Sequence, residues 1–195
     1  MLVKYIIGID EAGRGPLAGP VAVGAVCVGV NFKKSFLKGI KDSKGLSEKQ
    51  REEWFRKIIE EMKRGWLSYK VSFVSARVID KQGISKAVSK AIVRTLTRLN
   101  VSPKQVKIFL DGSLYAPKEF TQKTIIRGDE TIPLISLASV IVKVLRDRRM
   151  KRYAKRFPLY KLEVHKGYGT ELHRKLIKKH GPSELHRLSF LKNIL

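Results

Sequence analysis

Two short apolar runs lie close together near the start of the chain, at 2–9 and 21–30, and a loop rich in glycine and proline joins them. Both runs contain many β-branched residues, and such runs between glycines and prolines are typical of β-strands. The connecting stretch reads GIDEAGRGPLAGP over residues 8–20 and carries two adjacent acids, Asp10 and Glu11. The sequence therefore predicts two strands, with a carboxylate pair at the end of the first.

The later segments predict an α/β fold. Alternating apolar residues indicate a strand over 67–73, and short apolar runs indicate further strands over 106–110 and 124–127. Helical spacing of apolar residues, with capping and stop signals, predicts helices over about 47–65, 84–99, 134–157 and 170–180. Since no linker or internal repeat interrupts this order, we expect one domain over 1–195, a mixed β-sheet flanked by helices with a small helical part at about 158–195.

The charge of the chain points to its partner. Its 195 residues include 41 Lys and Arg against 17 Asp and Glu, which gives a formal net charge of +24. Such an excess attracts polyanions, and nucleic acid is the first candidate. A heat-adapted surface is the alternative, but heat adaptation usually adds charges of both signs.

Cysteine content and the length of the apolar runs bear on the compartment. Cys27 is the single cysteine and can form no intramolecular disulfide, which suits a reducing cytoplasm. The N-terminus lacks the pattern of a signal peptide, and the longest apolar run, at 134–142, is too short to span a bilayer. We therefore expect a cytoplasmic protein.

Four acids lie at the ends of predicted strands or in the turn just beyond: Asp10, Glu11, Asp111 and Asp129. The ends of strands are where α/β sheets hold their sites. Carboxylate oxygens suit Mg²⁺ or Mn²⁺, and a pair of such ions can support phosphodiester cleavage, whereas carboxylates without metal would repel a polyanion. Because successive strand residues point to opposite faces, Glu11 needs a bulge or a different role from Asp10.

Seven short motifs follow one another in a recognisable order. They are GIDEAGRG at 8–15, DSK at 42–44, LDG at 110–112, GD at 128–129, ASVIVKV with RD at 138–147, HKGY at 165–168 and HRLSF at 186–190. Together they resemble the motif set of the ribonuclease HII family, the type 2 ribonucleases H. The related type HIII enzymes carry a glutamate at the position of Asp129, so type HII is the better fit.

The resemblance implies a ribonuclease H-like fold and a divalent-metal-dependent endoribonuclease. Such an enzyme cleaves the RNA strand of RNA/DNA hybrids and single ribonucleotides embedded in duplex DNA. The cut falls on the 5′ side of the ribonucleotide and leaves a 3′-hydroxyl and a 5′-phosphate, in support of ribonucleotide removal during replication and repair. The resemblance also implies two ions, Mg²⁺ or Mn²⁺, held by Asp10, Glu11, Asp111 and Asp129.

The resemblance further implies how the nucleic acid is contacted. The loop Gly13-Arg14-Gly15 and Tyr168 are expected to read the 2′-hydroxyl at the RNA–DNA junction. Lys44, Lys143 and Arg146 are expected to contact the nucleic acid. Asp147 lies on the helix predicted over 134–157 between two arginines, and a supporting role is favoured over metal ligation.

The four histidines do not suggest a metal site. None pairs with a cysteine, so the sequence predicts no zinc site. We interpret the histidines as surface or phosphate-side groups: His165, His173, His180 and His186.

Two other interpretations remain open. One is a different nuclease of the same broad fold, such as a junction resolvase, and the other is a non-catalytic RNA-binding protein of ribosomal type. The set of four acids argues against the second. We expect a monomer that binds RNA/DNA hybrids and DNA duplexes containing ribonucleotides.

Overall fold

A computed structural model describes residues 2–32, 34–37, 39–40 and 45–194. Its strands are β1 (Tyr5–Ala12), β2 (Val21–Gly29), β3 (Leu67–Val74), β4 (Val106–Asp111) and β5 (Thr121–Ile125). Its α-helices are α1 (Glu48–Lys63), α2 (Ala76–Gln82), α3 (Ile84–Leu99), α4 (Gly128–Thr131), α5 (Pro133–Arg156), α6 (Leu162–His165) and α7 (Glu171–His180). Short 3₁₀ turns lie at Lys34–Leu37, Pro103–Gln105, Pro158–Tyr160 and Leu188–Phe190.

The five strands form one mixed sheet in the order β3-β2-β1-β4-β5. β1, β2 and β3 pair antiparallel, whereas β4 lies parallel to β1 and β5 lies parallel to β4. The expected mixed sheet flanked by helices is confirmed. β1 lies in the centre, and its residues 7–10 are buried on both faces because helices cover both sides of the sheet.

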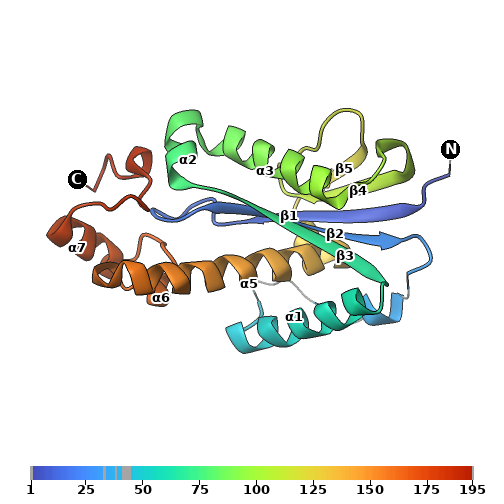
Figure 1. Ribbon diagram of the computed structural model, residues 1–195, viewed down its shortest axis with the longest axis horizontal. Helices are drawn as coiled ribbons and strands as arrows, with labels where there is room; N and C mark the ends of the chain where they lie inside the picture. Colours follow the sequence, from blue (N-terminus) through green and yellow to red (C-terminus); the bar gives the residue numbers. More distant parts are fainter. Residues whose placement is uncertain (1, 33, 38, 41–44, 195) are drawn as a thin grey trace.

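Helices cover both faces of the sheet (Figure 1). On one face, α3 contributes a row of buried apolar residues that includes Val88 and Ile92, and these pack with Ile7 and Ile9 of β1. On the other face, α5 packs over β1 and β2, and α1 packs against α5 and β3, with Ile58 of α1 fully buried. Along the described part of the chain, no helix combines the length and apolarity that crossing a bilayer requires.

Helix α5 lies directly on the central strands because two glycines leave room for its backbone. A methyl group on Gly8 of β1 would come within 2.3 Å of the Leu134 carbonyl oxygen, and one on Gly24 of β2 would come within 2.9 Å of Val142. Such distances leave no room for any larger residue unless the helix moves away. Gly8 and Gly24 therefore fix the distance between α5 and the sheet.

Several segments differ from the sequence-based prediction, among them β1, which lies three residues later than expected, and the four-residue helix α4, which was not predicted. The strand expected over 124–127 is β5 at Thr121–Ile125, because its position is set by parallel pairing with β4. Its residues are only partly buried, as in an edge strand, so they show little apolar alternation. The helix α2 was not predicted, because its seven residues are too few to show helical periodicity.

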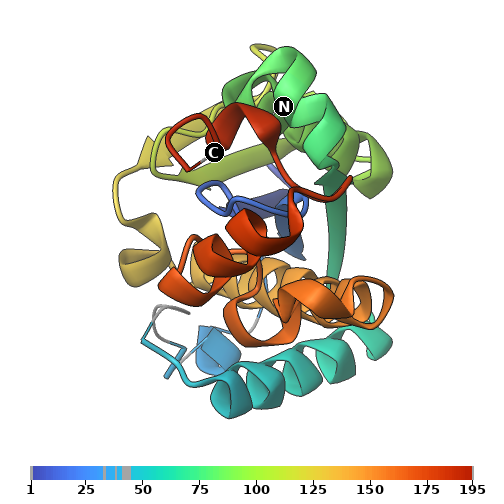
Figure 2. The same ribbon diagram turned by 90° about the vertical axis from the view of Figure 1, so that its left-hand side faces the viewer.

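The C-terminal helical elements pack over the end of the sheet where β1 and β2 are joined (Figure 2). The interpretation of the histidines as surface groups was wrong for three of them. His165, His173 and His186 are buried, and their rings form a row in which His165 stacks on His173 with 4.1 Å between ring centroids. The sequence gave no sign of this burial, because residues from three separate segments build the row.

Hydrogen bonds define the protonation of these rings. The amide of Ser183 donates to Nδ1 of His186 at 2.9 Å, so the proton of His186 lies on Nε2 and is donated to Nε2 of His173 at 3.1 Å. The proton of His173 then lies on Nδ1 and is donated to the Tyr168 carbonyl oxygen at 2.9 Å. Both rings are therefore neutral. Burial, together with the neighbouring His165, lowers the pKa of His173 and of His186 to about 4.

The first prediction concerns the close approach of α5. We expect Gly8→Ala to lower the free energy of unfolding by about 2 kcal/mol, because the added methyl group collides with the backbone of α5. Gly29→Ala is the matched control: its methyl group would meet no described atom within 4 Å, and we expect a change of less than about 0.5 kcal/mol. Urea unfolding of both variants measures the difference, and equal stabilities would contradict the packing argument.

The second prediction concerns the buried histidines. In the unfolded chain they bind protons below about pH 6.5, but in the folded protein only near pH 4. Their contribution to stability is therefore complete above about pH 6.5 and is lost as the pH falls toward 4, by about 3 kcal/mol for one ring. Urea unfolding between pH 7 and pH 4 measures the slope. The variant His173→Gln/His186→Gln should show a clearly smaller slope than the wild type, and an unchanged slope would contradict the prediction.

Candidate active site

Two of the acids are brought together by the parallel pairing of β1 with β4. The register pairs Ile9 with Leu110, so Asp10 and Asp111 lie one residue further along, at the ends of adjacent strands. Asp10 points toward α5, where Ser139 donates a hydrogen bond to its carboxylate. The amide of Glu11 donates a second hydrogen bond to Oδ1 of Asp10 at 2.7 Å.

The third acid is positioned by a short helix that starts just after β5. Oδ1 of Asp111 accepts hydrogen bonds from the amides of Gly128 at 2.7 Å and Asp129 at 3.3 Å, the first two residues of α4. This carboxylate therefore caps α4 and holds Asp129 beside it. From the other side, Ser136 of α5 donates a hydrogen bond to the Asp129 carbonyl oxygen at 2.6 Å.

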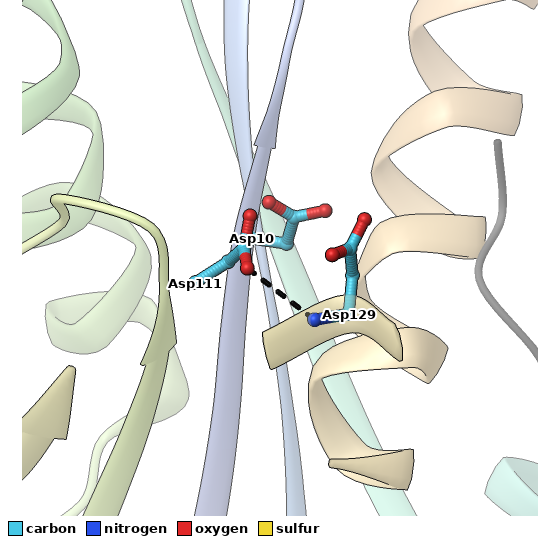
Figure 3. A group of neighbouring side chains, drawn as sticks. All are labelled: Asp10, Asp111 and Asp129. Atoms are coloured by element: carbon cyan, nitrogen blue, oxygen red, sulfur yellow. Dashed lines mark hydrogen bonds between the residues drawn. The ribbon is translucent and has the colours of Figure 1, made fainter. Parts of the chain in front are cut away.

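The three aspartates form one group (Figure 3). Asp10, Asp111 and Asp129 each offer a carboxylate oxygen, and these oxygens lie within 4.8 Å of one another. Burial raises the pKa of Asp10 well above its usual range, and the nearby charges of Glu11 and Asp111 raise it further. A cation between these oxygens would relieve both effects, and carboxylates are the ligands that Mg²⁺ and Mn²⁺ prefer. The donor set therefore fits a divalent metal.

Glu11 lies apart from this group, and β1 has no bulge. The strand pairs regularly with β2 through Ala12, so Glu11 points to the opposite face from Asp10. Its carboxylate lies 3.6 Å from the Arg14 guanidinium. Burial raises the pKa of Glu11, the Arg14 charge lowers it, and the Asp111 charge raises it. The bulge considered for Glu11 is therefore absent from β1, and the Glu11 charge still acts on Asp10.

A cavity of about 240 Å³ joins the acids to the loop after β1. Its lining contains acids, the glycine-rich loop, one lysine and one tyrosine: Asp10, Glu11, Ala12, Gly13, Arg14, Gly15, Asp111, Ser139, Lys143 and Tyr168. Tyr168 is 41% exposed, and Nζ of Lys143 lies 5.6 Å from the centre of its ring. The structure thus brings most of the sequence-predicted site residues into one cavity.

Arg146 differs from its expected role. Its side chain is fully buried and donates hydrogen bonds to the carbonyl oxygens of Pro20 at 3.1 Å, Lys166 at 3.1 Å and Ala18 at 3.4 Å. A guanidinium with no exposed surface is not available to a phosphate, so the direct nucleic-acid contact expected of Arg146 was wrong. Arg146 instead supports the loop through these hydrogen bonds, and its guanidinium carbon lies 5.8 Å from the centre of the Tyr168 ring.

The remaining site residues are Asp147 and Lys44. Asp147 is buried and forms an ion pair with Lys143 at 2.9 Å. It lies outside the group of three aspartates, and it holds the lysine that borders the cavity. Lys44 lies outside the described residues.

Sequence reasoning missed one residue beneath the loop. Arg187 is fully buried, and its guanidinium donates to the carbonyl oxygens of Gly13 at 2.6 Å, Arg14 at 2.8 Å and Gly19 at 3.0 Å. The available signal was its place in the motif HRLSF at 186–190, but the spacing of more than 160 residues concealed its partner.

Comparison with known proteins agrees with this geometry. The sequence profile of the ribonuclease HII family matches residues 7–193. Ribonuclease HII of Caldicellulosiruptor bescii is 43% identical over 192 residues, which cover 98% of this chain and 89% of that protein.

Solved structures give the same result. Ribonuclease H2 from Pyrococcus horikoshii OT3 has a TM-score of 0.77 at 25% identity, with 97% of this chain and 96% of that chain covered. The ribonuclease HII in the PCNA:RNase HII complex from Archaeoglobus fulgidus has a TM-score of 0.74 at 25% identity, with 94% of each chain covered. The match over nearly the whole chain shows that this protein belongs to the ribonuclease HII family and is a ribonuclease H, a hydrolase that cleaves RNA paired with DNA.

Proposed function

We propose that this enzyme cuts at ribonucleotides in duplex DNA, on the 5′ side of a single embedded ribonucleotide, as well as in longer RNA/DNA hybrids. The observation that carries the proposal is the cavity in which Asp10 and Asp111 of the aspartate group meet the Gly13-Arg14-Gly15 loop and Tyr168. One side of the cavity suits phosphodiester hydrolysis, and the other offers groups that can hydrogen-bond to a ribose. Its products would be a 3′-hydroxyl and a 5′-phosphate, and the excision of ribonucleotides from DNA would be its use.

The aspartate group would hold the metal. Asp10, Asp111 and Asp129 supply oxygen ligands of the kind that Mg²⁺ and Mn²⁺ take, and we propose two ions in keeping with phosphodiester hydrolysis. Bound there, such ions would lower the pKa of a water molecule and stabilise the charge on the leaving oxygen. Glu11 is proposed as the fourth acid, because it lines the same cavity and its charge acts on Asp10.

Basic residues around the cavity would hold the phosphates. Lys143 borders the cavity and is fixed by its ion pair with Asp147, and Arg14 lines the same space with a partly exposed side chain. Lys44 is proposed as a further phosphate contact. Together with the net charge of +24, these groups favour a polyanion close to the acids.

The glycine-rich loop and Tyr168 would identify the ribonucleotide. DNA and RNA present the same phosphates, so the 2′-hydroxyl, both a donor and an acceptor, has to be contacted directly. Gly13 and Gly15 leave the loop backbone open to close approach, and the Tyr168 hydroxyl and ring offer a hydrogen bond and a packing surface. All these groups come from one chain, so we propose a monomer as the active form.

The third prediction tests the metal ligands. We expect Asp10→Asn and Asp111→Asn each to lower cleavage of a duplex with one embedded ribonucleotide by more than about 100-fold, because each removes a charged ligand. Affinity for the duplex should be kept or increased, since repulsion of the phosphates falls. Mn²⁺ affinity, measured by isothermal titration calorimetry, should drop for both variants.

The matched control for this test is Asp147→Asn. Asp147 is a buried acid of the same region but lies outside the aspartate group, so Mn²⁺ affinity should stay near that of the wild type. Near-normal turnover by Asp10→Asn at saturating Mg²⁺ would contradict the ligand assignment. Cleavage of an all-DNA duplex or a four-way junction in preference to the ribonucleotide substrate would contradict the proposed function.

The fourth prediction tests Tyr168. Tyr168→Ala should sharply lower single-turnover cleavage at one embedded ribonucleotide and lower cleavage of a long hybrid less, because a long RNA strand offers alternative registers. Tyr168→Phe should remove only the share of the hydroxyl, a hydrogen bond worth about 1 kcal/mol or roughly a fivefold change in rate. Equal small losses on both substrates would mean that Tyr168 only packs against its neighbours.

A further inference from the structure

The loop between β1 and β2 is held by its carbonyl oxygens. Five of them, over residues 13–20, accept hydrogen bonds from two buried guanidinium groups. Arg146 of α5 donates to the carbonyl oxygens of Ala18 and Pro20. Arg187 donates to the Gly19 carbonyl between them and to those of Gly13 and Arg14, in the part of the loop that lines the cavity. Of these two guanidinium groups, Arg187 is the one that donates to carbonyls of the part of the loop that lines the cavity.

The bonds from Arg187 fix the direction of two amide groups. A trans peptide is planar, so the carbonyl of one residue and the N–H of the next point in opposite directions. Since the carbonyls of Gly13 and Arg14 point at Arg187, the N–H groups of Arg14 and Gly15 point away from it. These are two consecutive donors on the part of the loop that lines the cavity.

Gly13 depends on this support because its backbone has φ of +85°, a conformation that residues with a side chain rarely adopt. A glycine in this region can also adopt other conformations easily, so the chain itself does not fix the loop. Burial lowers the pKa of Arg187, and the neighbouring Arg146 charge lowers it further, so hydrogen bonds must offset an unfavourable environment. Those bonds go mainly to the loop.

Arg187 is itself held by the segment that carries it. Its amide donates to the Leu17 carbonyl oxygen at 2.8 Å, which ties the segment to the loop. On the other side, Asp80 of α2 accepts hydrogen bonds from the amides of Leu188 at 2.9 Å and Ser189 at 3.0 Å. The C-terminal segment is thus fixed between α2 and the loop, with the Arg187 side chain pointing into the loop.

We infer that Arg187 is a positioning residue for ribonucleotide recognition, which aims the N–H groups of Arg14 and Gly15 at the 2′-oxygen of the ribose. The inference rests on the proposed function of the loop. The guanidinium touches no substrate atom; it acts through the two peptide groups. Lysine is not an adequate replacement, because one ammonium group does not reproduce the planar fork that reaches several carbonyls at once.

The test measures binding with an inactive enzyme. In the Asp10→Asn background, affinities are measured for a duplex with one embedded ribonucleotide and for the same duplex in all-DNA form. We expect Arg187→Lys to lower the ratio of the two affinities about tenfold, the loss of one to two hydrogen bonds. Affinity for the all-DNA duplex should change less than about twofold, because the charge is kept.

Two further variants separate positioning from folding. Asp80→Asn weakens the attachment of the segment without removing a bond to the loop, so it should lower the unfolding temperature and leave the ratio within about twofold. Arg187→Ala should abolish the preference for the ribonucleotide duplex over the all-DNA duplex. Added guanidinium ion should restore part of this preference, whereas sodium ion at the same ionic strength should not.

The outcomes distinguish the inference from the function on which it rests. If the parent Asp10→Asn protein prefers the ribonucleotide duplex and folded Arg187→Lys keeps that preference, the positioning role is wrong and the proposed function stands. If the parent protein shows no preference, the proposed recognition by the loop is itself wrong. A matching fall of the ratio in Asp80→Asn would assign the effect to general loosening and overturn the inference.

Discussion

The parallel pairing of β1 with β4 is the constraint on which the site depends. It places two carboxylates side by side at the ends of the central strands, where repulsion and burial both act against their charged forms. Such an arrangement persists only if the surrounding fold determines it. Here the hydrophobic cores on both faces of the sheet fix the strands, and the capping of α4 by Asp111 fixes the third acid beside them. The free energy that holds the acids together comes from the sheet and its helices, and the acids themselves oppose it.

Sequence reasoning reached those parts of the fold that local patterns specify. β2, α3 and α5 were predicted close to their observed bounds, because their apolar residues repeat over enough positions to show a period, whereas β1, predicted over 2–9, lies at Tyr5–Ala12. β5 was displaced by several residues because an edge strand is only partly buried and its register comes from β4. The three aspartates could be predicted because each lies at or just after the end of an apolar run in the sequence, and strand ends meet at one edge of a sheet.

The parts that could not be predicted depend on long-range contacts of polar side chains. Arginine side chains are mostly exposed and histidines are often partly exposed, so the sequence suggested no burial for Arg146, Arg187 or His173. All three are buried with backbone carbonyl oxygens that accept their hydrogen bonds. The carbonyls bonded to the two arginines come from distant segments, and His173 also bonds the distant His186 ring. A pattern of residue types does not reveal which carbonyls a loop leaves unpaired. For the same reason, the sequence left two options for Glu11, a bulge in the strand or a role different from that of Asp10, and did not decide between them.

One face of α5 connects the catalytic and the recognition halves of the site. Ser139, Lys143 and Arg146 are spaced by four and three residues, which places them on the same side of a helix. Ser139 donates to Asp10, Lys143 lies beside Tyr168, and Arg146 supports the loop. Because Gly8 and Gly24 bring this helix against the sheet, the same close packing that stabilises the core also sets the distance between the acids and the groups proposed to read the ribose. A small shift of α5 would therefore alter cleavage and recognition together, whereas a change at Arg187 would reach only the loop.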